Sequence, residues 1–175
     1  PAREGYNLMN QCSMFLDTRG RPHVAHYRND SAGIPQQFHL HHNGSAWITR
    51  QVTGRRTAFQ RTGTGTLRLP VSRPAIAVDG RGVAYVMHRD EETGNRVRIS
   101  WASGPDYSSW RHSDVTEFAV GAWEPNFDSV AMRDHGALEI WVQYCEQGNH
   151  EKNVPTAAQQ AYLLAVDLKE LTQGG

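Results

Sequence analysis

The sequence repeats itself at a spacing of about 62 residues, and this repeat limits the folds that the chain can adopt. The segment FLDTRGRPHVAHYR (15–28) aligns with AVDGRGVAYVMHRD (77–90), and the two share Asp, Arg, Gly, Val and His at matching places. Further along, GSAWITRQVT (44–53) aligns with YSSWRHSDVT (107–116), which shares its Trp and its Val-Thr. A regular spacing of this size is typical of a chain built from similar structural units.

A third, looser copy follows in VAMRDHGALEIWVQYC (130–145). In this copy Asp134 and Gly136 are predicted to form the turn that precedes a strand. The outer part of the unit is predicted to run through QQAYLLAVDL (159–168). The chain therefore encodes about three units.

Each unit has the pattern of short strands joined by tight turns. An apolar strand ends at Asp-x-x-Gly, further short strands follow, and a Trp precedes the last one. No segment shows a sustained apolar period of 3.6 residues. The sequence predicts an all-β fold of about three four-stranded antiparallel β-propeller blades in one partial domain over 1–175, with repeats at approximately 12–53, 72–116 and 123–168. A β-sandwich with similar hairpins is the alternative.

A propeller of about three blades would not close into a ring. Propellers usually have about four to eight blades, and an arc of three leaves two sheet faces uncovered. We therefore expect either that the chain is part of a longer protein or that copies self-associate to close the ring. Trp47 and Trp110 occupy equivalent places in the first two units and are predicted to lie in the blade core.

Charge is unevenly distributed along a chain whose formal net charge is zero. The range 31–78 has no acidic residue and six arginines, whereas from Glu117 onward nine acidic residues accompany three basic ones. Arginine binds planar anions such as carboxylate or sulfate through paired hydrogen bonds, so an anionic ligand is favoured. The acidic second half argues against a nucleic-acid partner. No apolar run approaches the roughly 18 residues of a membrane span.

Five of the nine histidines lie close together in RPHVAHYRNDSAGIPQQFHLHHNGSAW (21–47), namely His23, His26, His39, His41 and His42. On a strand, His39 and His41 share one face, and His42 points to the other. Two such ligands and a third from His23 or His26 would form an open zinc site. Cys145 and His150 are weaker candidates for a structural zinc. A structural calcium, with no ligands assigned, is the other metal considered.

Acid–base chemistry is the competing interpretation of the histidines. At the repeat spacing, His23 occupies the place that Tyr85 takes in the next unit. If equivalent positions of adjacent blades lie side by side, an imidazole and a phenol would meet near the mouth of the propeller. Such a pair can remove one proton and return another. Both residues could instead be rim residues that satisfy backbone groups.

The GRPHVAHY segment, followed by PQQFHLHHNG, a Trp and Val-Thr, resembles the BNR-repeat polysaccharide lyases, including the ulvan lyases. The resemblance extends over residues 12–168 and is clearest over 12–116. Sialidase propellers carry a different motif, S-x-D-x-G-x-x-W, which this sequence lacks. Glycoside hydrolysis also needs a pair of carboxylates, which the acid-free range does not supply.

The resemblance implies a lyase that cleaves a uronic-acid-containing, ulvan-like and possibly sulfated polysaccharide by β-elimination. In that family a carboxylate clamp acidifies the C5 proton, a base removes it, and an acid protonates the departing O4. By position, His23 and His42 resemble the histidine pair, Tyr85 the tyrosine, and Arg98 the clamp. The chemistry requires no cofactor, although members of the family often carry a structural zinc.

Some of these assignments have alternatives. His41 could replace His42, because the two differ only in the strand face that they occupy, and Arg96 could replace Arg98. His26 would contact substrate or support the pair. The resemblance also implies a secreted or periplasmic protein. The sequence shows no signal peptide at its start, and two distant cysteines leave the redox compartment open.

A non-catalytic binding propeller is the second functional hypothesis. It would use the same arginines and tryptophans to hold a carbohydrate or a protein, since tryptophan faces stack on sugars. The two hypotheses differ in one structural requirement. A lyase needs histidine, tyrosine and arginine side chains that converge on one sugar, and a binding module does not.

Overall fold

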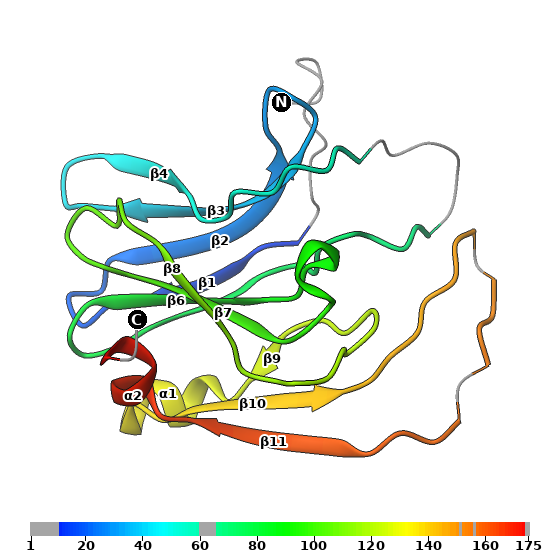
Figure 1. The fold of residues 1–175 in the computed structure, drawn as a ribbon. Coiled ribbons are helices and arrows are strands. Elements are labelled where there is room, and N and C mark those ends of the chain that lie inside the picture. Colours follow the sequence, from blue (N-terminus) through cyan, green and yellow to red (C-terminus); the bar gives the residue numbers. More distant parts are fainter. Residues whose placement is uncertain (1–10, 60–65, 151, 156, 174–175) are drawn as a thin grey trace.

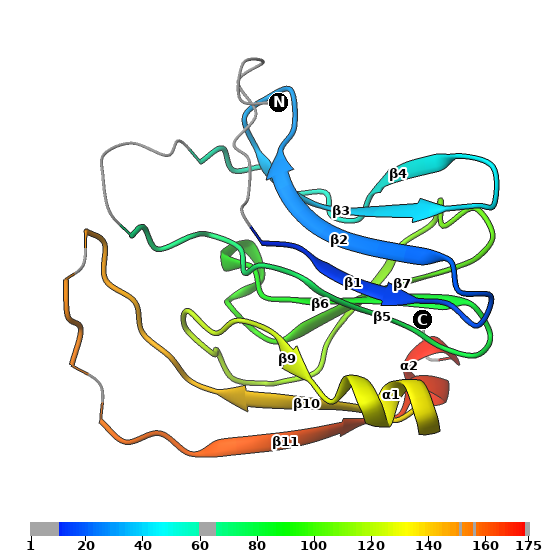
Figure 2. The ribbon, with the colours of Figure 1, turned by 180° about the vertical axis from the view of Figure 1, so that it is seen from behind.

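The computed structural model describes residues 11–59, 66–150, 152–155 and 157–173. Three antiparallel sheets lie one above the other, and two short helices cover one end (Figures 1 and 2). Strands make up 41% of the chain and helices 10%, which confirms the predicted all-β class. In the part of the chain described here, no helix is both long and apolar enough to span a membrane.

Each sheet is formed by consecutive strands in their order along the chain. Sheet 1 contains β1 (Ser13–Leu16), β2 (Pro22–Asn29), β3 (Pro35–His42) and β4 (Trp47–Gln51). Sheet 2 contains β5 (Ala75–Val78), β6 (Val83–His88), β7 (Arg98–Ser103) and β8 (Arg111–Asp114), with the 3-10 turn η2 (Glu91–Thr93). Sheet 3 contains β9 (Asn126–Phe127), β10 (Leu138–Gln143) and β11 (Ala161–Val166), and the helices are α1 (Ser129–His135) and α2 (Leu168–Gln173).

The repeated Asp-x-x-Gly turn joins the first two strands of sheets 1 and 2. Oδ1 of Asp17 and of Asp79 accepts hydrogen bonds from the backbone N–H groups two and four residues further on, at 2.8–2.9 Å. Gly20 and Gly82 have φ of 71° and 77°, a conformation that glycine adopts without strain. The repeat is therefore a hairpin signal in which the carboxylate replaces missing backbone partners.

Replacing Asp79 with alanine is expected to lower the free energy of unfolding by about 2 kcal/mol or more, because several hydrogen-bond donors lose their acceptor. Among them is the buried Tyr85 hydroxyl, which donates to Asp79 Oδ2 at 3.0 Å. Urea unfolding followed by tryptophan fluorescence measures the change. Asp134→Ala, in an exposed pair with Arg133, serves as the control. Equal midpoints for the two variants would contradict this role.

The third unit departs from the prediction. Asp134 and Gly136 do not form a strand turn, because α1 occupies this part of the chain. The Asp128 side chain accepts from the N–H groups of Val130 and Ala131 and so begins the helix. Gly136, at φ 67°, ends it. Sheet 3 has three strands among the described residues instead of the predicted four, although β11 does lie in the predicted outer segment.

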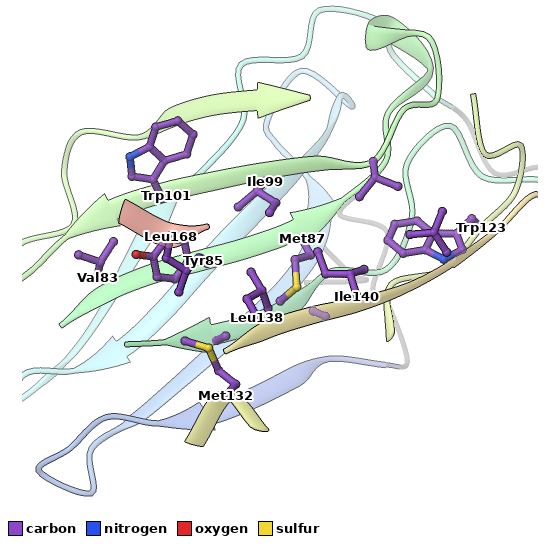
Figure 3. Packing of buried hydrophobic residues seen from close by; sticks show 14 of the residues in the cluster. Val83, Tyr85, Met87, Ile99, Trp101, Trp123, Met132, Leu138, Ile140 and Leu168 are labelled. Carbon is purple, nitrogen blue, oxygen red and sulfur yellow. The ribbon is translucent and has the colours of Figure 1, made fainter. Parts of the chain in front are cut away.

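We call the face that each sheet turns toward the next sheet along the chain its forward face, and the opposite face its back face. The largest hydrophobic cluster fills the space between the forward face of sheet 2 and the back face of sheet 3 (Figure 3). Tyr85, Met87 and Ile99 contribute from sheet 2, and Leu138 and Ile140 from sheet 3. Two smaller clusters lie between sheets 1 and 2.

The equivalent tryptophans of sheets 1 and 2 have different surroundings. Trp110 packs into the contact between sheets 1 and 2, as predicted. Trp47 does not lie in a core, and 54% of its surface is exposed. The reason is positional: Trp110 has sheet 1 behind it, whereas Trp47 lies on sheet 1, behind which the described chain places no further sheet.

Candidate functional site

Three of the five clustered histidines meet between sheets 1 and 2. His23 on β2 lies directly opposite His41 on β3, and His39 shares their face. The three rings are nearly parallel, with centroids 5.0–5.9 Å apart. His23 Nδ1 and His39 Nε2 share a hydrogen bond of 2.9 Å. With Tyr107, these residues are referred to below as the histidine cluster.

Tyr107 brings a phenol ring to the histidine cluster from sheet 2. Its ring stands edge-on to all three imidazoles, with centroids 4.7–5.3 Å away. The Tyr107 hydroxyl donates to the Gly82 carbonyl at 3.0 Å. Residues 103–106, which precede Tyr107 in the chain, are exposed. The imidazoles of the three histidines are at most 2% exposed. The site is thus assembled from two sheets and shielded from solvent.

Burial sets the protonation states of the histidine cluster. It lowers the pKa of His39 to about 2, with further lowering from His23 and His41. Burial also lowers the pKa of His23 to about 4, although Asp17 acts in the opposite direction. The pKa of Tyr107 is raised by burial and by Asp17. Near pH 7 the imidazoles are therefore neutral and the phenol keeps its proton.

His41 has the least satisfied side chain of the cluster. Its ring nitrogens make no hydrogen bond of good geometry, and the Pro105 backbone is the polar group that acts on the ring, where it raises the pKa. Burial and the neighbouring Arg50 guanidinium lower its pKa. Arg50 Nε donates to the Asp106 carbonyl at 2.9 Å, which holds this cation beside the cluster. A base, an acid and a cation that could bind a carboxylate thus lie close together.

The other two histidines of the segment lie on the back face of sheet 1. His42 Nδ1 accepts from the Gly44 N–H at 3.2 Å, and its ring is 5.2 Å from that of Trp47. His26 stacks on Phe38 at 5.7 Å. Burial, followed by the charge of Arg28, lowers the pKa of His26. His26 and His42 therefore do not join the histidine cluster.

Tyr85 is also separated from the histidine cluster. It does occupy the place equivalent to His23, but it points from the forward face of sheet 2 into the largest core (Figure 3). Its hydroxyl accepts from Arg81 at 2.9 Å, and its pKa is raised by burial and by Asp79. The expectation that His23 and Tyr85 lie side by side is wrong, because sheet 2 lies between the two faces that they occupy.

The two arginines proposed as carboxylate clamps bind an acidic residue of their own sheet. Arg98 Nε donates to Asp114 Oδ1 at 2.6 Å, and an Arg96 nitrogen lies 3.7 Å from Asp114 Oδ2. Arg98 begins β7, whereas the turn that leads to Tyr107 follows the end of this strand. Neither arginine contacts the histidine cluster, beside which the guanidinium of Arg50 lies instead.

The predicted metal sites have no complete ligand set among the residues described. No group of three or more His, Cys, Asp or Glu side chains there is arranged to hold an ion. The Cys145 thiol donates to the Gln143 carbonyl at 3.4 Å, and burial raises its pKa. In the histidine cluster, His23 and His39 direct nitrogens at each other instead of at a common point.

A second polar site lies where the first strands of the three sheets begin. A cavity of about 560 Å³ is bordered there by segments that precede β1, β5 and β9, among them Cys12, Arg73 and Glu124. The Arg73 backbone N–H donates to Glu124 Oε2 at 2.7 Å. Burial raises the pKa of Glu124. The buried Arg89 guanidinium acts on Glu124 but does not line the cavity, whose charged lining residues are Arg73 and Glu124.

Sequence reasoning missed Tyr107 and gave His39 only a metal role. The alternation of β3 already placed His39 with His41, so its position could have been found. Tyr107 lies in a loop, and its approach to sheet 1 depends on how the sheets pack. No local pattern encodes that contact.

Comparison with known proteins gives this chain no family. No protein-family model matches the sequence, and no curated protein matches it significantly. The features that bear on function are therefore the histidine cluster, the cavity and the stacked sheets.

Proposed function

We propose that this chain forms consecutive blades of a β-propeller that cleaves a uronate-containing polysaccharide by β-elimination. The observation that carries the proposal is the histidine cluster, in which neutral imidazoles, a protonated phenol and the Arg50 guanidinium gather from two adjacent sheets. These are the three kinds of group that the reaction needs. Such an enzyme would act on an extracellular anionic polymer and would therefore be secreted or periplasmic.

The arrangement of the first strands supports the propeller. β1 lies beside β5, where the Ile76 N–H donates to Ser13 Oγ at 3.1 Å. The Phe15 ring on β1 is 6.3 Å from the Phe127 ring on β9. The first strands of the three sheets thus lie close together, and each sheet continues from its first strand in chain order. This is the strand order of propeller blades.

The residues of the histidine cluster have complementary roles in the proposed reaction. Arg50 pairs with the uronate carboxylate and so stabilises the negative charge that develops at C5. His41 takes the C5 proton on a ring nitrogen, and its conjugate acid is stabilised by the Pro105 backbone and by Asp106. The C4–O4 bond breaks as the C4–C5 double bond forms, and Tyr107 gives its proton to O4. Substrate reaches these groups when the exposed turn over residues 103–106 moves aside.

The relay from Asp17 through His23 to His39 positions the base. An Asp17 carboxylate oxygen lies 4.0 Å from His23 Nε2, and His23 Nδ1 shares a hydrogen bond with His39 Nε2. The hydrogen bond between His23 and His39 orients the two rings that stack against His41. His23 is therefore a positioning residue in this proposal.

Ultraviolet absorbance of the unsaturated uronate product tests the proposal directly. Incubation with ulvan and other uronate polysaccharides is expected to raise this absorbance. Tyr107→Phe and His41→Gln should each lower the rate by about 10²–10⁴-fold, the range of general acid–base catalysis. His42→Ala, on the opposite face of the same strand, is the matched control. Full activity of Tyr107→Phe, or no product from folded protein, would overturn the assignment.

Carbohydrate binding without cleavage is the second candidate, and the cavity beside Arg73 favours it. Its walls come from the segments that lead into the first strand of each of the three sheets. Arg73 lines the cavity, and its guanidinium could bind the carboxylate of a sugar acid. Retention of glucuronate by a protein that releases no product, and loss of retention in Arg73→Gln, would support this candidate over the lyase.

A further inference from the structure

The stack of three sheets ends in two open faces that carry large apolar side chains. Met14, Leu16 and Trp47 lie on the back face of sheet 1 and are 53–63% exposed. Trp141 and Leu163 lie directly opposite each other on the forward face of sheet 3 and are 50% and 60% exposed. Exposed apolar groups gathered in this way mark an interaction surface.

The repeat indicates what covers the back face of sheet 1. Trp110, the equivalent of Trp47, is packed against the forward face of the sheet that precedes its own, where its ring stands 5.5 Å from that of His39. By the same geometry, Trp47 is suited to the forward face of another sheet of this kind. The forward face of sheet 3 is the one that the described residues leave open.

Charges on the two open faces are complementary as well. Arg28 and His26 lie beside Phe38 on the back face of sheet 1, with the Arg28 guanidinium 4.1 Å above the Phe38 ring. Glu139 lies beside Trp141 on β10 and on the same face of sheet 3, because alternate residues of a strand share a face. The wider sequence has the same asymmetry, since no acidic residue occurs over 31–78 and acidic residues predominate after Glu117.

We propose that two copies of this chain associate head to tail, with the forward face of sheet 3 of each copy packed on the back face of sheet 1 of the other. Such a contact joins two different surfaces and repeats until it closes a ring. Two copies of three sheets contribute six, which lies within the usual four to eight of a propeller, whereas three copies would contribute nine. A two-copy ring therefore covers all four open faces.

Solution mass and two like-charge variants test this contact. Light scattering coupled to size exclusion is expected to give twice the 19.6 kDa of one chain. Trp47→Glu places a negative charge against Glu139 of the other copy, and Leu163→Arg places a positive charge against Arg28. Each variant alone is expected to be monomeric. Val154→Glu, which alters an exposed apolar residue in a loop, is the control and should leave the mass unchanged.

Mixing the two variants distinguishes the head-to-tail contact from other pairings. A mixed pair retains one unaltered contact, between sheet 3 of the Trp47→Glu chain and sheet 1 of the Leu163→Arg chain, so the dimer is expected to return. If each face paired with its own counterpart, only one variant would change the mass and mixing would restore nothing. That result, or a monomer at every concentration of the unaltered protein, would overturn the proposal. This contact rests on the propeller of the proposed function, and lyase activity is measured separately, so a failure of the contact and a failure of the lyase assignment are distinguishable.

Discussion

Acidification from pH 7 to pH 4 is expected to remove most of the free energy of unfolding of this protein. Three buried histidines account for the expectation. Burial lowers the pKa of His23 to about 4, of His39 to about 2 and of His88 to about 3. His88, between sheets 1 and 2, shares a hydrogen bond of 2.9 Å with Ser100 and is fully buried. All three are held neutral in the folded protein.

The sign of this pH effect follows from the number of protons that the folded and unfolded chains bind. An unfolded histidine titrates near pH 6.5, whereas these folded ones take up a proton only at lower pH. Below about pH 6.5 the unfolded chain therefore binds more protons, and stability falls as the pH drops. At pH 4 each of these three histidines lowers the free energy of unfolding by about 3 kcal/mol. Together they offset most of the roughly 5–15 kcal/mol that stabilises a typical domain.

Urea unfolding at pH 7, 6, 5 and 4 measures this effect. His39→Phe should weaken the pH dependence, because it removes one of the three groups while keeping a ring in the stack. It also leaves His23 without a hydrogen-bond partner, so stability at pH 7 should fall by about 1–3 kcal/mol. His135→Gln, an exposed position on α1, should keep the dependence of the unaltered protein. Constant stability between pH 6.5 and 4.5 would contradict the buried neutral state of these rings.

The parts of the fold that local sequence encodes could be predicted, and they are mainly the hairpins. The turns at Asp17 and Asp79 are predictable because each carboxylate accepts hydrogen bonds from backbone N–H groups only two and four residues away. The same reasoning failed at Asp134 and Gly136. Asp and Gly also begin and end helices, and in the third unit Asp128 and Gly136 bound α1, which connects the paired strands β9 and β10.

The site could be predicted only as far as single strands determine it. Strand alternation places His39 and His41 on one face, and the structure agrees. The choice of partner across the sheets could not be made this way. Tyr85 matches His23 in the repeat and for that reason occupies the same face of the next sheet, which turns away from His23. Tyr107 reaches the histidines from a loop, so its role depends on the packing of whole sheets.

Among the contacts that are buried away from solvent, the Arg55–Asp90 ion pair is expected to be the most costly to break. Arg55 follows sheet 1 and Asp90 begins the turn η2 of sheet 2, and both side chains are buried. Arg55→Met leaves the Asp90 carboxylate without its cation and should cost about 3–5 kcal/mol. Asp90→Asn should cost less, because the Glu92 carboxylate still lies 3.7 Å from Arg55. Arg133→Met removes one member of an exposed pair and should change stability by less than about 1 kcal/mol.

A double-mutant cycle separates the pair from its surroundings. Once either charge is lost, removal of the other should cost little, so Arg55→Met with Asp90→Asn should destabilise far less than the sum of the single variants. Additive effects would contradict direct coupling. The contact between sheets 1 and 2 has small apolar clusters, buried histidines and this ion pair, whereas sheets 2 and 3 share the largest core. Breaking the pair should therefore release sheet 1 first, and amide exchange in β2 and β3 should rise before exchange in β6 and β10.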